Sequence, residues 1–244
     1  MKPQKHAASD VTGLETLELF SHAKAFNRWM FDVIRPYCRG AVLEIGSGIG
    51  NISTLLLEQL DDVTLSDLRS EYCAILRDRF QRYPGMKGVV RLDLAVGDLA
   101  DRCPELICKF DCVIALNVVE HIADHGRAVQ NARALLKPGG RLIILVPAYK
   151  WLYNPIDKQL GHCRRYTRTT MAALVEAEGL RVLHQEYFNA AAIPGWWVTG
   201  TLFRIDRIKA TPLQLYEKMV PVMRLVDRVA GKRLGLSVIT VAER

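Results

Sequence analysis

A glycine-rich turn between a buried strand and a helix constrains the fold of this chain more than any other feature. Residues 41–44 form an apolar run that ends in Glu44, and an apolar helix is expected over 51–60. Between them lie Gly46, Gly48 and Gly50. Glycine is needed there because the chain turns sharply, and because a ligand can approach the backbone closely only where no Cβ intervenes. The N–H groups at the start of the helix then face the ligand, so the turn predicts a nucleotide-binding site.

The spacing of the glycines indicates the kind of nucleotide. Dinucleotide-binding turns usually read G-x-G-x-x-G, whereas here the third glycine comes one residue early and an acid precedes the first by two residues. This pattern resembles motif I of the class I S-adenosylmethionine-dependent methyltransferases. The resemblance implies that the turn wraps the methionine and ribose part of the cofactor, through Glu44, Gly46, Ser47, Gly48 and Asn51. A nicotinamide-dependent oxidoreductase remains the alternative for a turn of this kind.

Two further acids follow predicted strands. Asp67 ends the run D-V-T-L-S-D, 23 residues after Glu44, which is the interval at which a βαβ unit brings an acid to the ribose hydroxyls. Leu68 follows it and is assigned to the cofactor as well. The methyltransferase resemblance implies a second acid, with an apolar neighbour, against the adenine after the third strand. Asp93 and Leu94 fit that role best, and Asp98 with Leu99 is the alternative.

The segment 110–122 supports the same assignment. Its residues 112–116 form a continuous apolar run, as expected for a central parallel strand, and Asn117, Glu120 and His121 follow at the strand's carboxyl end. The segment resembles motif IV of these methyltransferases, which implies that Asn117 lies near the methionine part of the cofactor. His121 is a candidate general base, because imidazole titrates near neutrality. The alternative is that Glu120 and His121 only orient the loop.

Residues 148–167 interleave aromatic and charged side chains, in the motif L-Y-x-x-x-D-x-x-x-G-H-x-R-R-Y-T. The motif resembles a subgroup of these methyltransferases associated with bacterial polysaccharide or glycolipid assembly and secondary metabolism. Adjacent arginines can hold a phosphate or carboxylate, or stack on a ring, and Asp157 with His162 can remove a proton from a hydroxyl. An ion pair between Asp157 and one arginine is the alternative. The expected acceptor-binding residues are Trp29, Tyr153, Asp157, Arg164, Arg165, Tyr166 and Trp196, with His162 as a second candidate base.

Strands and helices alternate through residue 146, which predicts an α/β fold with a doubly wound, mostly parallel sheet. The family resemblance adds a C-terminal antiparallel hairpin from strands over 180–188 and 236–242, together with a helical cap. We expect a single methyltransferase domain over 1–244. It comprises N-terminal lid helices (14–40), a cofactor-binding core (41–147) and two insertions on the substrate side (148–168 and 189–235). Residues 1–12 are expected to fray.

The charge is unevenly distributed along the chain. The formal net charge is +7, yet residues 141–170 and 202–244 each carry +5, which leaves −3 for the remainder. Basic segments favour an anionic substrate, then a membrane surface, then nucleic acid, although they can also be plain solvated surface. Nucleic acid is disfavoured because no N-P-P-Y or D-P-P-Y tetrad follows the fourth strand. We expect a small-molecule or glycolipid substrate, with peripheral membrane contact left open, and a monomer or homodimer.

The six cysteines show no C-x-x-C pair, and they are expected to be reduced and mostly buried in a cytoplasmic protein. No apolar run reaches 18 residues and the start of the chain is polar, so neither a membrane span nor a signal peptide is expected. No metal cluster of the catechol-methyltransferase type is visible, so we expect no metal. The predicted activity is methyl transfer from S-adenosylmethionine to an oxygen or nitrogen of a small-molecule, saccharide or lipid-linked acceptor. A non-catalytic module that binds the cofactor is the other alternative.

Overall fold

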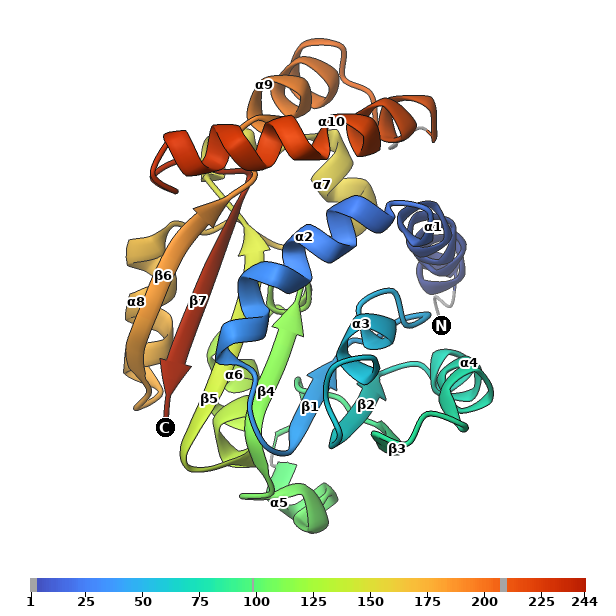
Figure 1. Ribbon diagram of the computed structural model, residues 1–244, viewed down its shortest axis with the longest axis vertical. Helices are drawn as coiled ribbons and strands as arrows, with labels where there is room; N and C mark the ends of the chain where they lie inside the picture. Colours follow the sequence, from blue (N-terminus) through green and yellow to red (C-terminus); the bar gives the residue numbers. More distant parts are fainter. Residues whose placement is uncertain (1–3, 98, 207–209) are drawn as a thin grey trace.

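The computed structural model describes residues 4–97, 99–206 and 210–244, without the side chains of 4–12 and 210–212, and shows one sheet between two layers of helices (Figure 1). The sheet order is β3-β2-β1-β4-β5-β7-β6. Its strands are β1 (Val42–Ile45), β2 (Val63–Asp67), β3 (Met86–Arg91), β4 (Phe110–Leu116), β5 (Leu136–Pro147), β6 (Arg181–Phe188) and β7 (Ser237–Glu243). The α-helices are α1 (Gln4–Ser21), α2 (Lys24–Ile34), α3 (Ser53–Leu57), α4 (Ser70–Phe80), α5 (Leu99–Arg102), α6 (His125–Leu135), α7 (Pro155–Leu160), α8 (Arg168–Ala177), α9 (Ala192–Trp196) and α10 (Ala210–Val229). The remaining helical segments are η1 (Arg35–Tyr37), η2 (Pro104–Leu106), η3 (Val119–His121), η4 (Lys150–Leu152) and the π-helical η5 (Trp197–Leu202).

The sheet confirms the predicted topology. Strands β1 to β5 pair in parallel, and β7 pairs antiparallel with both β5 and β6. The order reverses between β1 and β4, which lie side by side although they are far apart in the sequence. Open α/β sheets bind ligands at the carboxyl ends of the strands at such a reversal. The glycine turn follows β1 at this edge, and Asn117 follows β4.

Each face of the sheet has its own apolar core, because successive side chains of a strand point to opposite faces. Leu43 and Ile45 pack with α6 and α8 on one face. Val42 packs with α2, α3, α4 and α10 on the other.

The N-terminal region differs from the expectation. A helix begins at Gln4, where fraying was predicted, and the lid region expected over 14–40 is divided into α1 and α2 by a break at residues 22–23. The start of α2 is fixed from a distant part of the chain. The Glu217 carboxylate on α10 accepts hydrogen bonds from the backbone N–H groups of Ala25 at 2.8 Å and Phe26 at 2.9 Å. A carboxylate stabilises the positive end of a helix in this way, and the sequence of α2 alone gives no sign of it.

Two more boundaries differ, as does the burial of the cysteines. Helix α3 is shorter than the predicted 51–60, and β5 begins at Leu136, with an irregularity in its pairing with β4. The six cysteines are free, as expected. Only Cys38, Cys73 and Cys112 are buried, which corrects the expectation that most would be.

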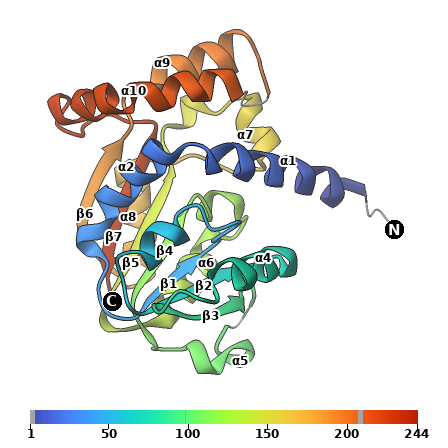
Figure 2. The ribbon, with the colours of Figure 1, turned by 45° about the vertical axis from the view of Figure 1, so that its right-hand side comes forward.

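The segment between β6 and β7 lies over the carboxyl edge of the sheet and carries α9, η5 and α10 (Figures 1 and 2). Asp227 of α10 ties this cap to the end of β6, since its carboxylate accepts hydrogen bonds from the backbone N–H groups of Asn189 and Ala190 at 2.5 and 2.6 Å. Of the helices described, none combines the length and the apolarity that a bilayer crossing would need.

Candidate active site

The glycine turn lies between α1 and η3. Gly46, Gly48 and Gly50 all have positive φ angles, of 70°, 55° and 89°, which glycine adopts without strain. A Cβ atom at Gly46 would lie 2.5 Å from Val118 Cγ2, and one at Gly48 would lie 3.0 Å from Leu17 Cδ1. Glycine at these positions therefore lets the turn pack against both neighbouring elements.

Asp67 links β2 to the turn. Its Oδ2 atom accepts a hydrogen bond from the Gly48 N–H and its Oδ1 atom from the Arg69 N–H, both at 2.9 Å. A carboxylate has about four acceptor sites, so the ribose hydroxyls of a nucleotide can still be bound. Burial raises the pKa of Asp67 above its usual value. The next side chain, Leu68, is 52% exposed, so an apolar surface lies open beside the buried acid.

Glu44 lies buried beneath the turn, at 4% exposure. Its Oε2 atom accepts a short hydrogen bond from the Ser53 hydroxyl. Burial raises the pKa of Glu44 to about 7. Ser47 joins the turn to β2, because its backbone N–H donates to the Ser66 carbonyl at 2.9 Å.

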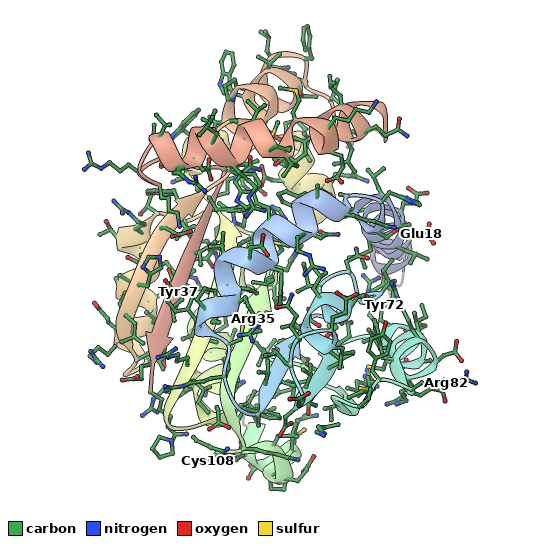
Figure 3. All side chains as sticks on the ribbon, viewed as in Figure 1. Glu18, Arg35, Tyr37, Tyr72, Arg82 and Cys108 are labelled. Carbon is green, nitrogen blue, oxygen red and sulfur yellow. The ribbon has the colours of Figure 1, made fainter. Side chains whose placement is uncertain are left out.

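The other predicted cofactor residue of the turn, Asn51, binds α1. Its Nδ2 atom donates to the Leu17 carbonyl at 2.9 Å. Helix α1 also approaches α4, since a Cβ at Gly13 would lie 3.6 Å from the Arg69 guanidinium and 4.0 Å from the Tyr72 hydroxyl. Figures 2 and 3 show α1 along this edge, with Tyr72 labelled beneath it in Figure 3.

The predicted adenine-binding pair has local partners. Asp93 is half-buried, and its Oδ1 atom accepts from the Ala95 N–H at 2.8 Å. The Leu94 side chain is 3% exposed and lies in the core, while its carbonyl accepts from Asn131 Nδ2 at 2.9 Å. The alternative acid, Asp98, lies outside the described residues.

The carboxyl end of β4 presents three polar residues. Asn117 is exposed and has a φ of 54°, a conformation that asparagine tolerates better than most residues. Glu120 is fully buried, and burial raises its pKa to about 8. Neither of its carboxylate oxygens has a hydrogen-bond partner in another described residue. His121 is exposed at the rim.

The loop after α7 is joined to this end of β4. The Cys163 N–H donates to the Glu120 carbonyl at 2.8 Å, and the Arg164 guanidinium donates to the carbonyls of Ile122 at 3.1 Å and Ala123 at 2.7 Å. These bonds bring His162 against His121, with ring centroids 4.8 Å apart and an edge-to-face geometry. The structure thus places both predicted bases side by side, although 41 residues separate them in the sequence.

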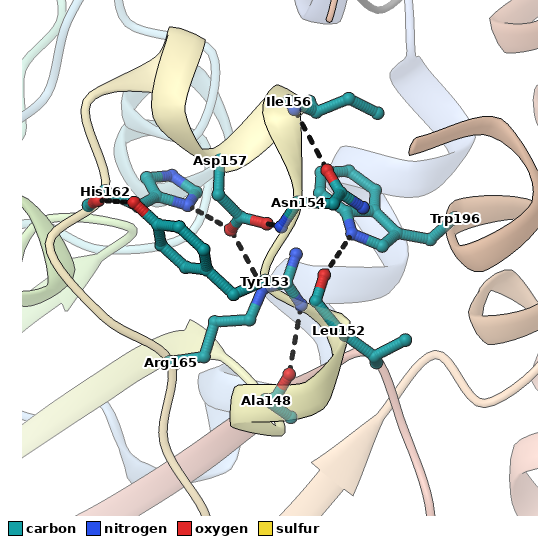
Figure 4. A network of polar contacts seen from close by, with 9 residues as sticks. All are labelled: Ala148, Leu152, Tyr153, Asn154, Ile156, Asp157, His162, Arg165 and Trp196. Atoms are coloured by element: carbon teal, nitrogen blue, oxygen red, sulfur yellow. Dashed lines mark hydrogen bonds and ion pairs between the residues drawn. The ribbon is translucent and has the colours of Figure 1, made fainter. Parts of the chain in front are cut away.

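His162 belongs to a network of hydrogen bonds and ion pairs centred on the buried Asp157 (Figure 4). Asp157 Oδ1 lies 2.8 Å from His162 Nδ1 and 2.8 Å from Arg165 Nε. Asp157 Oδ2 accepts from the Asn154 N–H at 3.0 Å, which forms part of the capping box of α7. Burial alone would raise the pKa of Asp157, but the hydrogen bonds from His162 and Arg165 outweigh it and the pKa is lowered.

Several residues predicted to bind the acceptor are engaged within the chain. The buried Arg165 donates to the Ala148 carbonyl at 3.0 Å, and its guanidinium lies 4.8 Å from the ring centre of Trp196. Trp196 Nε1 donates to the Leu152 carbonyl at 3.2 Å, and the Tyr153 hydroxyl to the His162 carbonyl at 2.7 Å. Arg165 and Asp157 therefore form the ion pair that was the alternative interpretation.

Two other predicted contacts lie in apolar surroundings. Tyr166 is 3% exposed, and its hydroxyl lies 3.0 Å from His125 Nδ1. Trp29 is 4% exposed and its ring centre lies 4.4 Å from that of Phe188, so α2 places this ring in the core beneath the cap. The side of α2 that carries Trp29 packs on the sheet, so the expected acceptor contact of Trp29 remains a prediction.

Comparison with known proteins agrees with this geometry. A family model described as a methyltransferase domain matches residues 20–185. The chain is 30% identical over 109 residues to a ubiquinone biosynthesis O-methyltransferase from Xylella fastidiosa, a match that covers 45% of this chain and 42% of that protein. It is also 30% identical over 172 residues to a highly reducing polyketide synthase from Aspergillus aculeatus, covering 69% of this chain and 6% of that protein. The matches thus span less than half the length of these relatives.

Solved structures show the same fold. An S-adenosylmethionine-dependent methyltransferase from Mesorhizobium loti superposes with a TM-score of 0.59 at 16% identity, over 88% of this chain and 97% of that one. The family match covers most of the chain, and the glycine turn and Asp67 lie at the switch point of the sheet. The chain therefore belongs to the methyltransferase domain family and has the class I fold.

Proposed function

We propose that this chain transfers a methyl group from S-adenosylmethionine to an oxygen of a small-molecule, saccharide or lipid-linked acceptor. The observation that carries the proposal is the group of titratable side chains, Glu120, His121 and His162, at the carboxyl end of β4 beside the glycine turn. An oxygen nucleophile must lose a proton as it is methylated, and a group of this kind serves that need. The similar protein from Xylella fastidiosa is, by its name, an O-methyltransferase.

The residues at the turn fit the cofactor. Asp67 keeps free acceptor capacity for the ribose hydroxyls, and the exposed Leu68 offers an apolar surface beside it. Gly46, which is exposed, leaves the backbone open to close approach. When bound, the cofactor supplies a methyl group carried on a sulfonium. As the acceptor oxygen takes the methyl group, the sulfonium becomes the neutral thioether of S-adenosylhomocysteine.

The other predicted cofactor residues are proposed to act in two ways. Asn117 and Glu44 lie on the methionine side, Asn117 from its exposed position and Glu44 from beneath the turn. Asp93 and the Leu94 backbone are proposed to meet the adenine. The remaining three, Ser47, Gly48 and Asn51, shape the turn through the hydrogen bonds described above.

The lid and the insertions are proposed to work as parts of a single domain. Helix α1 closes over the turn, because Asn51 holds the Leu17 carbonyl. The insertion over 148–168 positions the acceptor side, since Asp157 fixes His162 and Arg164 ties the loop to η3. His121 and His162 remain the proposed catalytic pair. Arg164, Tyr153 and Trp196 are proposed to frame the acceptor, whereas Asp157, Arg165, Tyr166 and Trp29 support that frame from buried positions.

An exposed apolar stripe on the cap favours a lipid-linked acceptor over a water-soluble one. Large apolar side chains are exposed on α10 at intervals of four and three residues, at Leu215, Met219, Val222, Val226 and Val229. Such spacing places them along one side of the helix. Exposed cations, Lys218, Arg228 and Arg233, lie on or beside α10. An apolar stripe with basic neighbours suits the surface of an anionic membrane, where a polysaccharide or glycolipid intermediate would be presented.

The experiment is a methyl-transfer assay with radiolabelled cofactor and three acceptor classes: saccharides, phenols and polyprenyl-linked saccharides. We expect label in an oxygen-linked methyl group of one class. His162→Gln should reduce turnover while S-adenosylhomocysteine binding is retained, and His184→Gln is the control, because His184 pairs with Glu186 away from the site. Transfer to nitrogen, or cofactor binding without transfer to any class, would contradict the proposal.

A further inference from the structure

Three side chains with metal-binding chemistry meet beside the glycine turn. Glu120 and His121 belong to η3, and His162 comes from the loop after α7. One potential ligand atom from each lies within 4.8 Å of the other two. No local spacing in the sequence reveals this group, because the hydrogen bonds of Cys163 and Arg164 bring the distant loop to η3.

Glu120 is the member that most needs an explanation. Its side chain is fully buried, and both carboxylate oxygens lack a hydrogen-bond partner in any other described residue. Buried carboxylates are normally paired or bound to a metal, because an isolated charge loses its hydration without compensation. A role that only orients the loop would not need a carboxylate, since the Glu120 contact to that loop is made by its backbone carbonyl.

The surroundings of His162 are those of a histidine that is oriented to bind a metal ion. Its Nδ1 atom lies 2.8 Å from Asp157 Oδ1, and because an ionised carboxylate only accepts, Nδ1 carries the proton. The Nε2 atom is then left with its lone pair. Histidines that bind metals usually donate their other N–H to a carboxylate in this manner, which fixes the ring and the tautomer.

We propose that Glu120, His121 and His162 bind a divalent transition-metal ion whose open positions take an oxygen of the acceptor. Two imidazoles and one carboxylate form a ligand set used by catalytic zinc and non-haem iron sites. Metal–ligand distances of about 2.0–2.2 Å require ligand atoms somewhat closer together than 4.8 Å. The His121 ring, which packs edge-on against His162, would have to turn toward Glu120 to reach these distances.

This inference rests on the proposed function and specifies how the acceptor loses its proton. A hydroxyl bound to the ion releases its proton to water more readily, because the ion stabilises the oxyanion. The oxyanion then bonds to the methyl carbon as the carbon–sulfur bond breaks, and the electron pair of that bond stays on sulfur. The imidazole nitrogens act as ligands in this arrangement, which replaces the expectation that the site holds no metal.

The surrounding charges accommodate such an ion. A carboxylate bound to a metal ion is ionised, so Glu120 and Asp157 would then supply two negative charges and Arg165 one positive charge, a net charge of −1. A divalent cation changes this to +1, and the bound oxyanion returns it to zero. The acceptor thus completes the charge balance of the buried group.

The test is metal binding by the purified full chain, without cofactor or acceptor. After chelator treatment, Co²⁺ is titrated and its visible absorption recorded, and bound Zn²⁺ is measured by equilibrium dialysis. We expect one ion per chain. The affinity should fall more than about 100-fold in Glu120→Gln and His162→Ala, and about 10–100-fold in Asp157→Asn, which removes the carboxylate that orients His162. His184→Ala, at a histidine paired with Glu186 elsewhere, should bind the ion unchanged.

Binding of S-adenosylhomocysteine by each variant reports on folding. Glu120→Gln preserves the side-chain shape and should bind it normally, so a lost metal site in this variant is not a lost fold. A wild-type chain that binds S-adenosylhomocysteine but neither Co²⁺ nor Zn²⁺ would overturn the metal site and leave the proposed function standing. A metal affinity that is equal in wild type and Glu120→Gln would overturn it as well. Failure to bind S-adenosylhomocysteine would instead count against the proposed function.

Discussion

Asp67 Oδ2 accepts a hydrogen bond from the Gly48 N–H at 2.9 Å, and this contact joins the end of β2 to the middle of the glycine turn. The two residues are 19 positions apart in the sequence, and the turn packs against Leu17 of α1 and against Val118, which precedes η3. A single carboxylate therefore shapes the turn and, in the proposed function, binds the ribose of the cofactor.

Replacing Asp67 by Ala should weaken S-adenosylhomocysteine binding by roughly 1–3 kcal/mol, because a hydrogen-bonded group of the ligand or the turn loses its partner. Isothermal titration calorimetry measures the change. Asp61→Ala is the control, since Asp61 is an exposed acid before the opposite end of β2. If Asp67→Ala and wild type bind S-adenosylhomocysteine with equal affinity, Asp67 does not contribute to the cofactor site.

Gly46→Ala should abolish detectable cofactor binding and destabilise the chain by roughly 1–3 kcal/mol, as expected for backbone strain at a residue with positive φ. The new Cβ would also lie 2.5 Å from Val118 Cγ2. Adding Val118→Ala should restore only part of the stability, because it relieves the contact and leaves the strain. Gly88→Ala is the control, since no atom lies within 4 Å of a Cβ there. Urea denaturation that shows the same loss for both glycines would refute this.

Asp157→Asn should destabilise the chain by about 3–5 kcal/mol, because it leaves the buried Arg165 guanidinium without its counter-charge. The double variant Asp157→Asn with Arg165→Met should recover much of that loss. The folded-state pKa of Asp157 is lowered, so its stabilisation is present above pH ~4 and is lost as the pH falls further. Denaturant melts of the three chains at pH 7 provide the measurement. A double variant no more stable than the single one would show that the ion pair is not the cause.

Glu44→Gln should stabilise the chain without cofactor more at pH 8 than at pH 5. Burial raises the folded-state pKa of Glu44 from 4.5 to about 7, so the folded chain retains a proton that the unfolded chain releases. The folded chain therefore loses stability as the pH rises from 4.5 to about 7, and above pH 7 this loss is complete. The resulting loss in the free energy of unfolding is at most roughly 3 kcal/mol, since a difference of one pKa unit corresponds to about 1.4 kcal/mol. Thermal melts at both pH values measure it, with the exposed Glu58→Gln as control. If the difference between Glu44→Gln and wild type is the same at both pH values, burial does not raise the pKa of this carboxyl.

Replacing Val222 and Val229 together by Glu should abolish co-flotation of the chain with phosphatidylglycerol vesicles, because both side chains belong to the exposed stripe of α10. Gln214→Glu adds negative charge to the same helix outside the stripe and should reduce flotation only slightly. If wild type fails to float, or the double variant floats equally well, the stripe does not contact membranes. A concentration-dependent dimer in wild type that the double variant loses would assign the stripe to a second copy of the chain.

The doubly wound, mostly parallel sheet could be predicted because it depends on local patterns. The buried run after Phe110 marks a strand, and Glu44 and Asp67 mark the ends of β1 and β2, so right-handed crossovers leave few topologies. The N-terminal helices could not be divided correctly, since the start of α2 depends on Glu217 almost 200 residues later. The irregular start of β5 likewise arises from its pairing with β4.

The candidate site was only partly visible in the sequence. The turn and Asp67 were found because their spacing follows from one βαβ unit. Glu120 was assigned no role beyond the alternative of orienting a loop, because nothing near it in the sequence shows that its carboxylate lies buried without a partner among the described residues. Asp157 and Arg165 were placed at the acceptor for the chemistry of their side chains, with an ion pair as the alternative, and the fold buries both as that pair.

Calorimetric titration of the purified chain with S-adenosylhomocysteine and, in parallel, NADH tests most directly whether the glycine turn serves methyl transfer. We expect S-adenosylhomocysteine to bind at one site per chain, with an affinity that Asp67→Ala lowers, and NADH to produce no binding heat. Binding of NADH alone, or S-adenosylhomocysteine binding that Asp67→Ala and Gly46→Ala both leave unchanged, would contradict the assignment of this turn.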